Sequence, residues 1–272
     1  MLEAIFKYNF LQNAVFSAIL ASIACGIIGT IIMEKKMVMI SGGIAHTAFG
    51  GIGMGYYFNI EPIIGGLIFS VLAALGIPTI QRKTTTNSDI LIGLFWSFGM
   101  AVGILFVAFT PGYPPDMTSY LFGDILTVSK IDLYIIVVLD VIIISVILSF
   151  FNLFKAFLFD EEFTAVLGIP TTLLDYILFI LIALTVVILI RVVGIILIIA
   201  LLTAPTSIAK QFTYNLKHLM ALSILLGILF CLLGLLFSYK LNIPSGAAII
   251  ILSVSAYFIF SAFKKILSRA KI

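Results

Sequence analysis

The chain has 272 residues, of which 62% are hydrophobic and only 10% are charged, and its mean hydropathy is +1.29. Soluble domains carry about 25% charged residues, so the composition excludes an ordinary soluble enzyme or binding domain. The net charge of +3 is no argument for nucleic-acid binding. The apolar runs suit helices of about 20 residues and lack the alternation of a membrane barrel. They predict an all-α polytopic membrane bundle, with a single transmembrane domain over residues 1–272.

Nine apolar runs lie along the chain, and each is a candidate membrane helix. The sixth and seventh runs are interrupted only by Arg191 and Gly194, and the seventh is short. We therefore expect eight or nine spans, the lower number applying if one piece is broken or re-entrant. The runs cover residues 10–33, 37–58, 63–80, 90–109, 131–154, 173–192, 194–209, 219–239 and 244–263.

Basic residues predict the orientation, because cytoplasmic loops of membrane proteins are enriched in lysine and arginine. If the Glu34-Lys35-Lys36 turn is cytoplasmic and the spans alternate, most basic residues fall on that side. Only four of the 15 lysine and arginine residues then remain outside. We therefore expect a plasma-membrane protein with its N-terminus outside and its C-terminus in the cytoplasm. The four are Lys7, Lys130, Arg191 and Lys240.

The second run contains the glycine-rich stretch Ile40–Gly55, with His46 inside it. An ionisable ring at membrane depth is costly, which makes His46 a candidate functional residue. On a helix, His46, Gly50 and Gly53 share one face, which another helix or a passing ion could approach. A glycine-rich packing surface with a hydrogen-bonded histidine explains the same pattern, and the residues alone leave both interpretations open.

A short capped helix is predicted in the cytoplasmic connection before Pro170. Asp160 suits the N-cap position, two acidic residues follow in the first turn, and Gly168 ends the helix. Its apolar face could dock into a groove of another protein or lie in the membrane interface. The residues concerned are Asp160, Glu161, Glu162, Phe163, Val166, Leu167 and Gly168.

Another intramembrane carboxyl group, Asp140, lies in the middle of the fifth run. It could line a cavity, or be protonated or paired against another helix. The sequence contains no GxxxxGK[ST] phosphate-binding loop and no HExxH or GxSxG motif. We therefore predict that the chain is not an enzyme and that any ATP hydrolysis takes place in a separate chain.

Five further motifs occur in one order over most of the chain: EKKMVMISGGIAHTAFGGIGMGY (34–56), NSDILIGLFWSFGMAVGIL (87–105), SYLFGDILTVSKIDL (119–133), DEEFTAVLGI (160–169) and VVGIILIIALLTAPTSIAK (192–210). This series resembles the membrane subunit of the zinc/manganese family of ABC importers. The resemblance implies a homodimer of this permease in the lipid bilayer, a cytoplasmic ABC ATPase and an extracytoplasmic metal-binding protein. It implies no cofactor in this chain, since the divalent metal is the cargo and ATP binds the partner subunit.

The resemblance also implies roles for particular residues. The family's pathway histidine falls on His46, and its coupling helix falls on Asp160 to Gly168. Many members have an aspartate one helical turn before that histidine, where this chain has Gly42. An Asp–His pair suits a divalent ion, so with Gly42 the metal would be held more weakly, by His46 from each protomer or by a carboxylate from another helix. The implied function is ATP-driven import of zinc or manganese ions through a homodimer pathway.

Two other functions remain as alternatives. An ABC permease for a metal chelate would typically be longer, with ten spans and a wider substrate path. A proton-coupled secondary transporter would need no ATPase and would use Asp140 as its proton relay.

Overall fold

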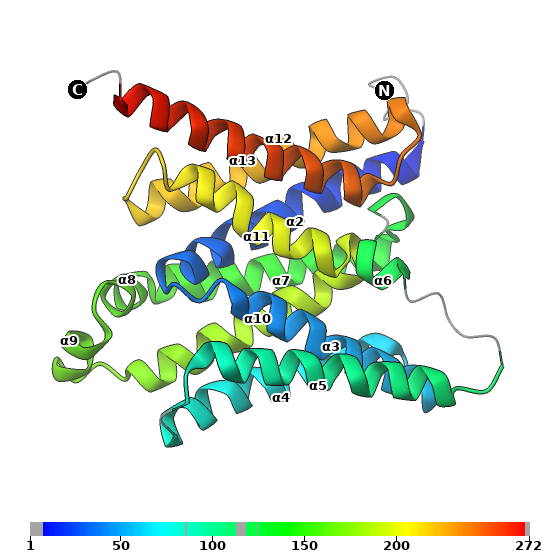
Figure 1. Cartoon of the computed structure of the whole chain (residues 1–272), viewed down its shortest axis with the longest axis horizontal. Helices are drawn as coiled ribbons and strands as arrows, with labels where there is room; N and C mark the ends of the chain where they lie inside the picture. The colour runs from blue at the N-terminus through cyan, green and yellow to red at the C-terminus, as the bar shows by residue number, and fades with distance from the viewer. Residues whose placement is uncertain (1–7, 85, 113–117, 124, 270–272) are drawn as a thin grey trace.

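The computed structural model describes residues 8–84, 86–112, 118–123 and 125–269, and their regular structure is entirely helical (Figure 1). The all-α prediction is therefore confirmed for these residues. The long helices are α2 (Asn9–Glu34), α3 (Met39–Tyr57), α4 (Pro62–Lys83), α5 (Ser88–Phe109), α7 (Lys130–Ser149), α10 (Thr171–Val193), α11 (Ile195–Ala209), α12 (Leu216–Leu241) and α13 (Ser245–Arg269). The short ones are α6 (Thr118–Phe122), the 3₁₀ turn η1 (Ile125–Thr127), α8 (Phe151–Phe159) and α9 (Glu161–Val166).

Each of the nine predicted apolar runs overlaps one long helix, and the fifth run also extends into the short helix α8. Within the described ranges, seven of these long helices are long and apolar enough to cross a membrane. The other two are α11, with only 15 residues, and the glycine-rich α3. The count of eight or nine complete spans therefore stays a prediction.

The fifth predicted run is wrong at its C-terminal end. The sequence predicts a span to residue 154, but α7 ends at Ser149 and a new helix, α8, begins at Phe151. Phe154 and Phe157 of α8 are each only 1% exposed. The apolar character continues past Ser149 because α8 buries its own aromatic face, and hydropathy alone does not reveal the change of direction between the two helices.

The long helices form a bundle in which α12 and α13 lie on one side, α3, α4 and α5 lie on the other, and α2, α7, α10 and α11 lie between them (Figure 1). Most of α2 and α10 is buried, whereas only a small part of α5 and α13 is buried. The first residues of α2 and the last residues of α13 lie at opposite ends of the bundle (Figure 1). An odd number of crossings would produce this arrangement.

Glycines bring α3 against both of its neighbours. A Cβ atom at Gly50 would lie 2.7 Å from the carbonyl oxygen of Gly99 on α5, and one at Gly51 would overlap the backbone of Gly65 on α4. No side chain fits at either contact, so the helix backbones touch directly, as glycine allows. The glycine part of the predicted face on α3 is therefore a helix-packing surface.

Candidate functional site

His46 lies in the middle of α3 on the side that faces α5. The neighbouring residue Thr47 fixes the register of the two helices, because its Oγ1 donates to the carbonyl oxygens of Gly43 (2.7 Å) and Phe95 (3.0 Å). Phe95 precedes Trp96 on α5. The imidazole of His46 stacks on the indole of Trp96, with ring centroids 4.1 Å apart and planes only 9° from parallel.

The Nδ1 atom of His46 is buried and has no hydrogen-bond partner in the described part of the chain. One helical turn earlier, a Cβ atom at Gly42 would lie 3.5 Å from Cζ3 of Trp96 and 3.7 Å from Cδ1 of Ile199, which is ordinary van der Waals contact. The indole therefore covers both Gly42 and His46 on this side of α3.

Among the residues described, no group of three or more His, Cys, Asp and Glu side chains is placed so that it could hold a metal ion. Asp140 is 4% exposed and both of its oxygens lack a partner there. It lies on α7, which packs mainly against α2 and α10, whereas α3 packs mainly against α4 and α5. The structure does not bring Asp140 to His46.

The short capped helix predicted before Pro170 forms as α9 (Glu161–Val166), where the sequence places it. In α9, Oδ1 of the N-cap residue Asp160 accepts from the backbone N–H of Phe163 at 2.9 Å. Gly168 follows the helix with a φ of +78°, a conformation that favours glycine. The predicted apolar face points outward, since Phe163 and Leu167 are 60% and 58% exposed.

Glu161 belongs to an ion cluster that the sequence analysis missed. Its carboxylate lies 2.6 Å from Nζ of Lys35 and 3.7 Å from the guanidinium of Arg82. The same two cations contact Asp175 on α10, Arg82 at 3.0 Å and Lys35 at 3.7 Å. Nζ of Lys35 also sits 3.6 Å above the ring of Phe157. The four charged residues, called the Glu161 ion cluster below, connect α9 to the ends of α2, α4 and α10.

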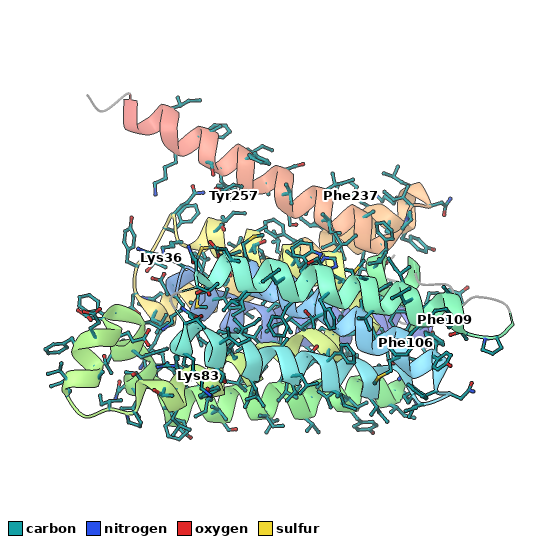
Figure 2. The ribbon with its side chains drawn as sticks, turned by 60° about the horizontal axis from the view of Figure 1, so that its bottom comes forward. Lys36, Lys83, Phe106, Phe109, Phe237 and Tyr257 are labelled. Atoms are coloured by element: carbon teal, nitrogen blue, oxygen red, sulfur yellow. The ribbon has the colours of Figure 1, made fainter. Side chains whose placement is uncertain are left out.

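The sequence did contain a signal for this cluster. The predicted orientation places Lys35, Arg82 and the two acidic residues of the short helix at the same end of the bundle. Figure 2 shows their neighbours Lys36 and Lys83 at the same end, with Phe106 and Phe109 at the opposite end. The sequence could not show which of the two acids turns toward the cations, because this depends on how α9 docks. Glu162 is exposed and lies outside the cluster.

A second ion cluster lies at the opposite end of the bundle. Arg191 contacts Glu61 at 3.2 Å and Asp132 at 3.1 Å. Asp132 also closes a capping box with Ser129 at the start of α7. Gly194, with a φ of +77°, separates α10 from α11 directly after this cluster. The predicted interruption at Arg191 and Gly194 is therefore a real helix boundary.

Long apolar helices, a lone imidazole inside the bundle and charged clusters at its two ends define a polytopic helical membrane protein. More specifically, the chain belongs to the ABC 3 transport family, whose model matches residues 7–264.

Relatives match over almost the whole chain. An uncharacterised membrane protein of Synechocystis is 43% identical over 97% of this chain and 94% of its own. A probable metal transport system membrane protein of Chlamydia trachomatis is 37% identical over 87% and 83% of the two chains. The manganese transport system membrane protein MntC of Listeria monocytogenes is 31% identical over 95% and 92%. The solved structure of PsaBC from Streptococcus pneumoniae in complex with Fab matches with a TM-score of 0.85, 30% identity and coverage of 95% and 93%.

Proposed function

We propose that this chain is the membrane permease of an ATP-driven importer of divalent metal ions, with manganese or zinc as the cargo. The observation that carries the proposal is full-length similarity to metal transport membrane proteins, combined with one imidazole placed inside the helix bundle. The name of the Listeria relative makes manganese the first ion to test.

The pathway we propose runs between two copies of the chain and passes His46. In this arrangement, a second copy would contribute a second imidazole beside His46 to a transient site, and imidazole is a ligand that suits such ions. Few ligands on the path suit transport, since a translocation site must release the ion that it binds. An extracytoplasmic binding protein would deliver the ion at the end of the bundle that holds Arg191 and Glu61.

A separate cytoplasmic ATPase is the second partner that we propose, and the segment from Asp160 to Gly168 would be its coupling surface. The exposed side chains of Phe163 and Leu167 offer apolar area for docking. Beside them lies a cavity of about 930 Å³ between α8, α9 and the start of α12. Because Glu161 is bound to Lys35 and Arg82, a displacement of α9 would pull directly on α2 and α4.

Cellular metal content tests the proposal. The chain is expressed with the ATPase and the binding protein that we propose as its partners in a metal-starved host, as wild type, as His46→Ala and as His218→Ala. We expect the wild type to raise manganese or zinc, and His46→Ala to lose most of this rise. The other histidine, His218, is exposed in the first turn of α12, so His218→Ala is the matched control and should import normally.

Co-purification of the subunits shows in each case whether the complex assembles. An assembled wild-type complex that raises no metal would contradict the proposed cargo, and the chelate alternative would then be tested with labelled chelates. Normal metal import by His46→Ala would remove His46 from the pathway and make it a packing residue.

A further inference from the structure

We infer that Trp96 is a positioning residue for His46, which holds the imidazole by ring stacking at the point where the ion passes. The inference rests on the proposed function, because it gives His46 a role that needs a defined ring orientation. A histidine that ligates a metal ordinarily donates its other ring N–H to a carboxylate or a carbonyl oxygen, which fixes the ring. The structure shows no such hydrogen bond to His46 in the described residues, and its Nδ1 is buried.

Stacking replaces the missing hydrogen bond. The two ring planes are 9° from parallel with centroids 4.1 Å apart, so the indole fixes both the plane of the imidazole and its distance from α5. Rotation of the imidazole about its side-chain bonds would break this contact. An aromatic pair of this kind contributes beyond the area that it buries, and it can therefore hold a ring that has no polar partner.

The contact between α3 and α5 is built around this pair. A Cβ atom at Gly99 would lie 2.5 Å from Cα of Thr47, so the two backbones meet within one residue of His46. The hydroxyl of Thr47 then binds the carbonyl of Phe95, the residue before Trp96. Thr47 and Phe95, which adjoin His46 and Trp96 in the sequence, thus hold the two helices together. This contact leaves Trp96 little freedom to move away from His46.

The arrangement also predicts a weak site. An ion bound through Nε2 requires the proton on Nδ1, where a buried N–H would have no acceptor. Trp96 therefore supplies orientation without the added basicity that a hydrogen-bonded carboxylate would give to the ring. An imidazole held in this way suits brief binding of the ion more than its storage.

Trp96 is the only tryptophan of the chain, so its fluorescence reports directly on His46. In the purified complex in lipid nanodiscs, titration with MnCl₂ should change the tryptophan emission of this chain in a saturable way. ATPase and binding-protein tryptophans are replaced by phenylalanine in the complex used for this experiment. The same titration of His46→Gln should give no saturable change. A saturable change that persists in His46→Gln would overturn the inference, because the ion would then act on Trp96 independently of His46.

Uptake kinetics test the positioning role itself. Trp96→Leu removes the ring and should raise the KM for the metal about fivefold, the effect expected for one aromatic pair, while Trp96→Phe keeps a ring and should restore most of the affinity. Phe98→Leu is the matched control, since Phe98 is 63% exposed on the same helix and should leave KM unchanged. An unchanged KM in Trp96→Leu, together with lost uptake in His46→Ala, would refute the positioning role and leave the proposed function standing. If Trp96→Leu does not assemble, Trp96→Met takes its place with the same expected rise in KM, because it also removes the ring, and an unchanged KM in that variant would refute the positioning role.

Discussion

Glu161 and Glu162 are adjacent in the sequence but have different surroundings. Glu161 is held by Lys35 and Arg82 in the Glu161 ion cluster, whereas Glu162 is exposed. Lys35 and Asp175, the inner members of the cluster, have side chains only 13% and 11% exposed. In the sequence, both acids are equivalent residues of the first helical turn. The structure assigns the first to the attachment of α9 and leaves the second free to meet another protein.

The difference between the surroundings of Glu161 and Glu162 can be tested by measuring the stability of two variants. Glu161→Gln removes a charged partner from Lys35 and should lower the stability of the detergent-solubilised protein by about 1–2 kcal/mol, less than for a fully buried pair because Glu161 is partly exposed. Glu162→Gln is the control and should change stability by less than about 0.5 kcal/mol. Thermal unfolding of the two variants measures the difference. Equal midpoints would show that the cluster does not secure α9.

The connection after α7 contains two separate helices with different surfaces. α8 buries Phe154 and Phe157 against the bundle, while α9 directs Phe163 and Leu167 away from it. A short helix with an exposed apolar face and a fixed N-terminus is suited to transmit a displacement, because it can be held from one side and attached on the other. This observation supports the coupling role that we propose for Asp160 to Gly168.

If the ATPase docks on α9, a polar substitution on the apolar face of this helix should weaken ATPase binding. Leu167→Ser should weaken co-purification of the ATPase about tenfold, since burial of one leucine contributes about 1.5 kcal/mol or more. Phe109→Ser is the control, because Phe109 lies at the opposite end of the bundle (Figure 2) and is similarly exposed. Undiminished ATPase binding by Leu167→Ser would place the coupling surface elsewhere.

In the whole molecule, basic residues gather at one end of the bundle. Lys35, Lys36, Arg82 and Lys83 lie at one end, while Tyr57, Phe58 and Phe106 form an aromatic group at the other. Lysine and arginine favour the cytoplasmic side of a membrane, and aromatic side chains favour the interfaces. The distribution supports the proposed orientation, with α9 in the cytoplasm.

Thiol labelling in intact cells tests the orientation. The native cysteines, Cys25 and Cys231, are buried, so they should give little background. A membrane-impermeant maleimide should label Lys240→Cys, which we place outside, and should label Lys83→Cys only after the cells are opened. Both positions are exposed in the structure. The reverse pattern would invert the topology and place α9 outside, where no ATPase could reach it.

The sequence by itself determined the all-helical membrane class, the positions of the nine long helices, the capped helix after Asp160 and the candidate His46. These features follow from hydropathy and from local backbone chemistry, both of which act over a few neighbouring residues. The departure at Gly42, where many members of the family have an aspartate, was also recognised from the sequence through the family resemblance. The end of the fifth helix was predicted wrongly, because its apolar run continues across the boundary into α8.

Only the tertiary structure decided which side chains meet. Trp96 lies in the sequence motif over residues 87–105. Its stacking on His46 depends on the register of α3 against α5, which Thr47 and Gly99 set. The Glu161 ion cluster likewise joins residues from four segments of the chain. Hydrophobic burial is non-directional, so it specifies that the helices pack together. Close packing of side chains and glycine backbones then selects their neighbours.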